Sequence, residues 1–229
     1  MYVVKRLFWA CTTVLIISAV TFFLMHTIPG DPFMSEKTTE ETRSMLREKY
    51  GLDEPVWVQY QKYIKNMFHG DFGVSFVLEK NRPIADIVWS SFWVSAKTGI
   101  WALLTAVIAG IIFGSIAGFS KDSYLDTWIR FLSTLGISVP SYVVASYLML
   151  LFSVKWNILP PTGIDEIKGY VMPVSVLALQ PTCYFIRLTR GSIVEVLQQD
   201  YMRTVNAKGL STVRGRFFHA LKNSCVPII

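Results

Sequence analysis

Cysteine and catalytic signatures are scarce in this sequence of 229 residues. Three cysteines occur: Cys11 and Cys183 lie within apolar runs, and Cys225 lies beside another, so neither a disulfide framework nor a metal-ligand spacing is present. The phosphate-binding motif G-x-x-x-x-G-K-[ST] is absent, as are H-E-x-x-H, G-x-S-x-G and any paired-cysteine motif. The three histidines are scattered at residues 26, 69 and 219. We therefore expect no catalytic site, no metal and no cofactor in this chain.

Charge is also scarce. Asp, Glu, Lys and Arg make up 17% of the residues against 52% hydrophobic residues, and none lies inside a long apolar run. This composition is too apolar for an ordinary soluble domain and places the chain in a bilayer. A proton-driven transporter would carry an ionisable group near the midplane, so its absence favours energy from a partner. An intramembrane hydrolase is disfavoured because no nucleophile and base lie within the runs.

Four long apolar runs predict four transmembrane helices. They cover residues 7–28, 98–119, 131–154 and 170–186. Lys5 and Arg6 precede the first run, so the N-terminus is expected to stay in the cytoplasm. Four completed spans then return the chain to the cytoplasm after residue 186.

A stripe of small residues runs along the second apolar run at four-residue spacing. It comprises Ala102, Ala106, Gly110, Gly114 and Gly118. Small residues in register let another helix approach closely, so we assign the stripe to helix packing. Pro140 and Pro181 fall in the third and fourth runs, where proline removes a backbone donor. They are candidate kinks around a translocation path, and packing kinks without function are the alternative.

The segment between the first two runs, residues 31–97, is polar and nearly balanced in charge, with nine Lys and Arg against ten Asp and Glu. Long segments of this kind cross the membrane largely regardless of charge, so we expect it on the outer face. A capping box at residues 38–41 predicts a helix to Tyr50, ended by Gly51, and Pro55 begins a second helix. Its apolar face comprises Val56, Tyr60, Ile64 and Met67 or Phe68. We interpret this face as packing on the membrane domain, and a platform for an external partner is the alternative.

A basic segment follows the fourth apolar run. Its cations are Arg187, Arg190, Arg203, Lys208, Arg214, Arg216 and Lys222, against Glu195 and Asp200. This excess is typical of a cytoplasmic loop and accounts for much of the net charge of +6 without nucleic acid. Residues 196–208 lack Gly and Pro, Gly209 ends the run, and Ser211 can cap a restart, which predicts helix, glycine turn and helix. A hairpin anchored on anionic lipid is the alternative.

The order of residues in this basic segment resembles the coupling loop of binding-protein-dependent ABC importer permeases, most closely the oligopeptide, dipeptide and nickel branch. The matching residues are Asp200, Tyr201, Met202, Arg203, Thr204, Ala207, Lys208, Gly209 and Leu210, then residues 219–223 and Pro227. Val205 stands where the family often has Ala, and Asn206 where it often has a basic residue. Residues 29–32 and 69–75 also resemble the family, so the resemblance covers essentially the whole chain.

The resemblance implies an all-α integral membrane protein, a polytopic helical bundle of the type I ABC importer permease kind. Such permeases continue with two more helices after the loop, so we expect the first four or five of six transmembrane helices here, plus an extracytoplasmic helical insertion. The implied regions are 1–30, the N-terminus and first transmembrane helix; 31–97, the extracytoplasmic helical region; and 98–229, the core transmembrane domain with the coupling loop at 191–226. The location is the plasma (inner) membrane of a prokaryote.

The implied function is that of a permease subunit in an ATP-driven peptide importer. The loop at 195–223 would dock on an ATPase through Asp200, Tyr201, Arg203, Thr204, Ala207, Lys208, Gly209 and Leu210. Implied partners are a second homologous permease, two cytoplasmic ATPase subunits that hold ATP and Mg, and an extracytoplasmic solute-binding protein. Nickel chelates and glutathione are alternative cargoes. Free metal is disfavoured as cargo because no His, Cys or Met cluster lines a span. A membrane scaffold or channel with a lipid-binding loop is the alternative from another class.

Overall fold

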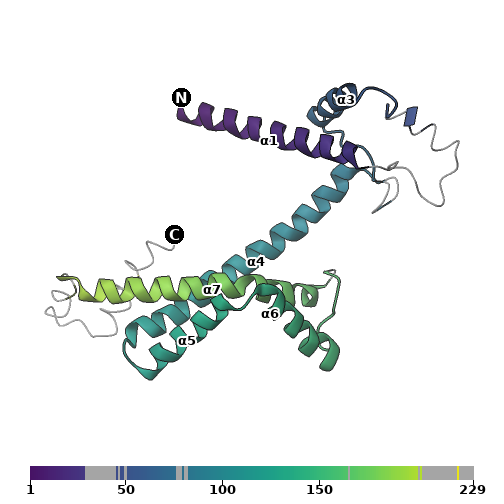
Figure 1. Ribbon diagram of the computed structural model, residues 1–229. Coiled ribbons are helices and arrows are strands. Elements are labelled where there is room, and N and C mark those ends of the chain that lie inside the picture. The colour runs from purple at the N-terminus through teal and green to yellow at the C-terminus, as the bar shows by residue number, and fades with distance from the viewer. Residues whose placement is uncertain are drawn as a thin grey trace. The chain divides into compact units, whose positions relative to one another are not determined.

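The computed structural model describes residues 1–28, 45, 47–48, 51–75, 79, 82–164, 166–200, 202 and 221. Its elements are, in chain order, α1 (Tyr2–Thr27), α3 (Val56–Phe68), α4 (Ile84–Phe119), α5 (Tyr124–Ser138), α6 (Ser141–Leu148), the π-helical η1 (Met149–Lys155) and α7 (Ile167–Gln198) (Figure 1). Within the described residues, extended pairing is limited to a bridge between Val74 and Pro83. The predicted all-α class is confirmed.

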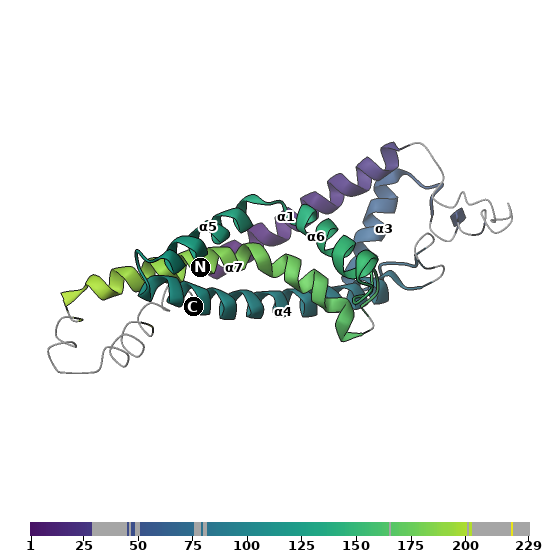
Figure 2. The same ribbon diagram turned by 90° about the horizontal axis from the view of Figure 1, so that it is seen from below.

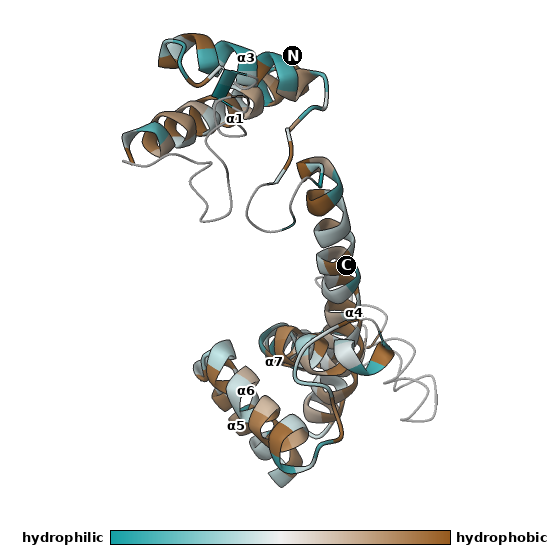
Figure 3. Ribbon diagram, turned by 90° about the vertical axis from the view of Figure 1, so that its right-hand side faces the viewer, coloured by the Kyte–Doolittle hydropathy of each residue, from teal (hydrophilic) through white to brown (hydrophobic). Residues whose placement is uncertain are grey.

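Three of the described helices are long and apolar enough to cross a membrane, namely α1, α4 and α7. The segment Tyr124–Ser138 qualifies only together with Ser141–Lys155, and the two are bent by 98° at the break between them. Hydrophobic residues follow one another along α1 and α4, whereas α3 carries a larger share of hydrophilic residues (Figure 3). These positions agree with the four predicted apolar runs, and the prediction of a polytopic membrane protein is confirmed.

Two of the helices extend beyond the predicted runs. The second begins at Ile84 instead of residue 98, and the fourth continues to Gln198 instead of ending at residue 186. Both extensions contain charged residues but no proline, and a helix continues wherever its backbone hydrogen bonds can form, whether or not its side chains are apolar. The helix α7 thus includes Arg187, Arg190 and Glu195, and it ends at Gln198, inside the segment predicted as the coupling loop.

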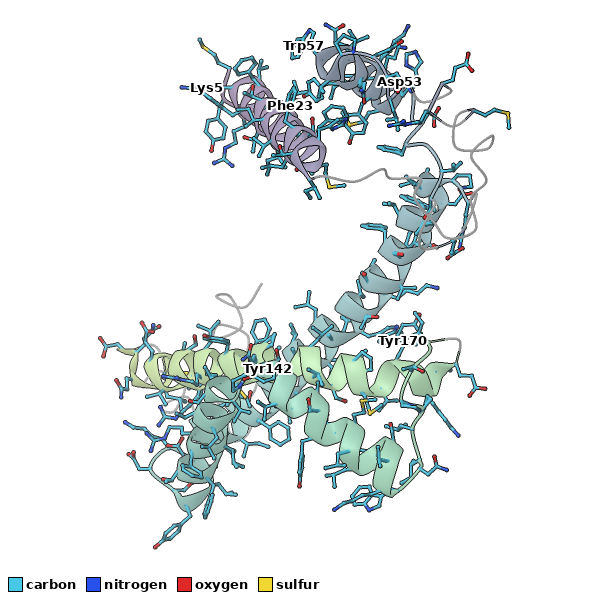
Figure 4. The ribbon with its side chains drawn as sticks, turned by 45° about the vertical axis from the view of Figure 1, so that its right-hand side comes forward. Lys5, Phe23, Asp53, Trp57, Tyr142 and Tyr170 are labelled. Carbon is cyan, nitrogen blue, oxygen red and sulfur yellow. The ribbon has the colours of Figure 1, made fainter. Side chains whose placement is uncertain are left out.

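The first of two compact units comprises residues 1–91 and joins α1 to α3 through aromatic side chains. The ring of Tyr60 lies 5.3 Å from that of Phe22 and 5.6 Å from that of Phe23, between centroids. Phe23 lies on the side of α1 that faces α3 (Figure 4). Gln59, on the same face of α3, is buried and bonds to His26 with 3.0 Å between Oε1 and Nε2. The predicted apolar face of α3 therefore packs on the first transmembrane helix through Tyr60, whereas Phe68 is 74% exposed.

The turn after α3 depends on glycine at two positions. Gly70 and Gly73 have φ values of +77° and +76°, a backbone region that side chains with a Cβ rarely adopt. Between them, the Asp71 carboxylate accepts a hydrogen bond from the Gly73 N–H at 2.9 Å. The helix predicted between residues 38 and 50 lies largely outside the described residues.

The second unit comprises residues 92–229, and its core is formed where α7 packs on α4, α5 and α6. Views from two directions show α7 beside α4 and α5 (Figure 2). Few large side chains are buried there, and Ala102, Ala106 and Ala178 form one of its clusters with Val174 and Phe185 packed against it. Small residues thus bring the helices together, as expected for a membrane bundle, where the lipid provides no hydrophobic drive for helix association.

Candidate functional site

The small-residue stripe of α4 lies against α7. Ala106, Gly110, Gly114 and Gly118 are all buried. A Cβ placed on Gly114 would lie 2.6 Å from the Cβ of Thr189, and one placed on Gly118 would lie 2.8 Å from the Cβ of Ile193. A Cβ on Gly110 would likewise meet Phe185. Each step of four along α4 matches a step of four along α7, so the two helices run parallel in close contact.

A buried ion pair joins the beginning of α5 to α7. Arg190 donates from Nε to Asp126 Oδ1 at 2.6 Å and from Nη2 to Oδ2 at 2.7 Å. Asp126 is fully buried and the Arg190 side chain is 19% exposed. The fork of a guanidinium matches both oxygens of a carboxylate, which makes this the strongest type of hydrogen-bonded pair. We call it the α5–α7 ion pair.

The local sequence places Asp126 for this contact. Ser123 caps α5, and its hydroxyl accepts from the Asp126 N–H at 3.2 Å. Asp122 turns the backbone at φ +64° and donates its own N–H to Asp126 Oδ2 at 3.1 Å. Arg130, one turn further along α5, has its Nε 3.4 Å from Asp126 Oδ1. The carboxylate lies in the first turn of α5, where the helix dipole also favours negative charge.

Next to the ion pair lies a basic cavity of about 390 Å³, lined by Arg130, Thr134, Arg187 and Arg190. Arg187 is exposed. The two arginines of α7 thus differ, since Asp126 binds Arg190 whereas Arg187 is exposed.

The end of α7 is held against the end of α4. Val196 and Met202 are buried together, with Phe119 and Leu197 packed on them. Ile193 and Thr189, about one and two turns before Val196, are fully buried. The last turn of α7 is therefore held against the end of α4.

The predicted site residues are placed as follows. Asp200 is exposed, and it is the second residue after the end of α7. Tyr201, Arg203, Thr204, Ala207, Lys208, Gly209 and Leu210 lie outside the described residues. Pro140 lies in the break between α5 and α6, which are bent by 98°. Pro181 lies inside α7, which continues through it.

Sequence reasoning missed the α5–α7 ion pair. In the sequence Arg190 counts among the cations of the basic segment, and Asp126 is 64 positions away from it. The third predicted run starts, and the fourth ends, on the same side of the membrane. Asp126 and Arg190 are therefore expected at a similar depth, which is the one indication of their contact in the sequence. Among the described residues, no group of three or more His, Cys, Asp or Glu is arranged to hold a metal ion.

Two family models together match most of this chain. Residues 110–229 match the family "Binding-protein-dependent transport system inner membrane component", and residues 1–90 match its N-terminal family, "Binding-prot-dependent transport system membrane comp, N-term". The chain is 39% identical to the dipeptide transport system permease protein DppB of Bacillus subtilis (strain 168), over 100% of this chain and 74% of the relative. It is 37% identical to the oligopeptide transport system permease protein OppB of Escherichia coli (strain K12), over 100% of this chain and 75% of that relative. The glutathione transport system permease protein GsiC of Shigella flexneri serotype 5b (strain 8401) is 34% identical over the same shares.

Proposed function

Because this chain belongs to the family of binding-protein-dependent transport system inner membrane components, we propose that it is the permease subunit of an importer for dipeptides or oligopeptides. Membership confirms the resemblance found in the sequence and the prediction of a transporter permease that is not itself a catalytic enzyme. The chain is an inner-membrane component, and its family depends on a binding protein. The match to a dipeptide permease, at 39% identity over 100% of this chain and 74% of the relative, carries the choice of cargo.

The proposed assembly contains a second, homologous permease, two cytoplasmic ATPase subunits and an extracytoplasmic solute-binding protein. ATP and Mg²⁺ would be held by the ATPase subunits, since this chain has no phosphate-binding loop. The N-terminus would be cytoplasmic, as Lys5 and Arg6 in the first turns of α1 support. The parallel course of α4 and α7 supports the same topology, because both helices would then run from the outside to the inside.

In the proposed mechanism, closure of the ATPases moves the segment that follows α7. Asp200 would begin the contact with the ATPase, and the loop through Leu210 would complete it. α7 would receive this movement directly, because the segment continues from its end at Gln198. The helices packed on α7, namely α4, α5 and α6, would then shift and expose the translocation path to one side of the membrane at a time.

Uptake by the reconstituted complex tests the proposal. The four kinds of subunit are placed in proteoliposomes with ATP available to the ATPases, and uptake of a labelled dipeptide, a labelled pentapeptide, glutathione and a nickel chelate is compared. We expect saturable peptide uptake that requires both ATP and the binding protein. Uptake of glutathione or nickel chelate without peptide uptake would contradict the proposed cargo. Peptide uptake that persists without the ATPase subunits would contradict the importer itself and favour a channel.

A further inference from the structure

A buried charge pair between two helices of a membrane bundle calls for a reason beyond stability, since well-packed apolar residues often stabilise a protein as much. The α5–α7 ion pair involves Arg190, which lies about two helical turns before α7 ends at Gln198. We propose that Asp126 and Arg190 are positioning residues that lock α5 to α7, so that a movement received after Gln198 is transmitted to α5 and onward to α6. This inference rests on the proposed function, because it assumes that an ATPase moves that segment.

The packing between α4 and α7 supports a transmitting role for the pair. The contact along Gly110, Gly114 and Gly118 consists of close, non-directional approach, and Thr189 Oγ1 and Ser115 Oγ are buried there without a hydrogen-bond partner. A surface of this kind fixes how near the helices lie but resists sliding only by shape. The bidentate Asp126–Arg190 bond, in contrast, fixes distance and direction together.

The contact between α5 and α7 is strongly polar at one end only. At the other end of α5, Gln180 Nε2 donates to the Val139 carbonyl oxygen at 3.5 Å, which is long for a hydrogen bond. The Asp126 carboxylate, by comparison, accepts from Arg190 twice and from the Asp122 N–H, with Arg130 close by. α5 is thus held firmly at its first turn, and a displacement of α7 would act on α5 at this position first.

The same carboxylate also connects α5 to the turn before it. Asp122 belongs to the turn at residues 120–123 that follows α4, so Asp126 ties this turn, α5 and α7 into one polar cluster. The end of α4 is in turn packed on Val196 and Met202 through Phe119. The residues around the exit of the coupling loop therefore form a single cluster in which the ion pair supplies the directional bond.

The test separates positioning from stability. The variants are Asp126→Asn, Arg190→Gln and the double variant D126N/R190Q, each in the complete complex with its ATPase subunits and binding protein. The measurements are the amount of assembled complex, basal ATP hydrolysis, and peptide taken up per ATP hydrolysed. The matched control is Arg187→Gln, which removes the same charge from an exposed position of the same helix.

Asp126→Asn leaves Arg190 without its carboxylate, and Arg190→Gln leaves the buried Asp126 with only the longer contact to Arg130, so we expect less assembled complex from both. The double variant has no unpaired charge, and we expect its assembly and basal ATP hydrolysis to recover. Its peptide uptake per ATP should nevertheless fall about tenfold, within the usual range of coupling between distant sites. R187Q should keep the wild-type ratio.

Wild-type uptake per ATP in the assembled double variant would overturn the proposal and leave the pair a purely structural role. If the double variant does not assemble, Arg190→Lys decides instead, because it keeps the charge and loses the two-pronged geometry. An assembled R190K complex with the wild-type ratio overturns the proposal, and a lowered ratio supports it. Failure of the wild-type complex to take up peptide would be a different result, since it contradicts the proposed function.

Discussion

At the contact between α4 and α7, single glycines set how closely the two helices approach. Gly114 is restricted from two sides, because a Cβ there would meet both the Thr189 side chain and the Ile186 carbonyl oxygen, the latter at 2.8 Å. Backbone atoms cannot move aside as a flexible side chain can. One added methyl group must therefore push the helices apart.

We expect Gly114→Ala to destabilise the permease by about 1–3 kcal/mol, the usual cost of overpacking a close contact. The matched control is Gly99→Ala on the same helix, where a new Cβ would meet no atom within 4 Å. The measurement is the thermal midpoint of the purified complex in mild detergent. Equal midpoints for both variants would show that this contact is looser than the structure indicates.

Between elements, the contact of α3 with α1 depends on rings and two polar side chains. Tyr60 stacks against Phe22 and Phe23, and its hydroxyl lies 3.2 Å from Ser18 Oγ. Gln59 donates to the carbonyl oxygens of Leu52 and Glu54 and so holds the turn before α3. The outer helix is therefore attached to the first transmembrane helix by specific contacts.

A double-mutant cycle of Phe22→Ala and Tyr60→Ala should give a coupling energy of about 0.5–1.5 kcal/mol, as measured for other aromatic pairs. Phe68→Ala is the control, because Phe68 is on the same helix and largely exposed. Unfolding of the purified subunit followed by tryptophan fluorescence reports both. Strict additivity of the two substitutions would contradict the contact.

The two candidate kinks show why one residue type has different effects in different elements. Val139, which precedes Pro140, is extended at φ −82° and ψ 124°, the conformation that a following proline favours, and the helix ends there. α7 continues through Pro181, because neighbouring helices can satisfy the freed backbone groups in a membrane bundle. The break at Pro140 therefore changes the chain direction, whereas Pro181 does not end its helix.

For the whole molecule, the most direct question is which side of the membrane each connection faces. The proposed topology puts α3 outside and the turn between α4 and α5 inside. Lys65 and Lys121 are exposed in these two regions and accept a single cysteine without disturbing a described contact.

In a background without Cys11, Cys183 and Cys225, we expect Lys65→Cys to react with a membrane-impermeant thiol reagent in intact cells. Lys121→Cys should react only after the membrane is permeabilised, because the positive-inside rule places Lys5, Arg6 and the basic loop in the cytoplasm. Labelling of both variants after permeabilisation is the control for exposure. Reaction of K121C in intact cells would contradict the proposed topology and indicate the opposite orientation.

The sequence by itself determined the membrane location, the four apolar runs, the packing stripe and the family. Hydropathy, spacing and residue order depend on residues that are close together in the chain, so they can be recognised without the fold. It also placed the break near Pro140, since proline restricts the residue before it. The ends of α4 and α7 were not determined in this way, because helices in a bundle continue past the apolar runs where their backbone bonds are supported.

Only the tertiary structure decided which charges are engaged. Asp126 and Arg190 have no proximity in the sequence, and each resembles an ordinary charge at a membrane boundary. The fold brings the first turn of α5 beside α7, and burial then makes an unpaired charge costly enough that the two must bind each other. Which of several arginines binds that carboxylate depends on the register between α5 and α7, which the tertiary structure sets.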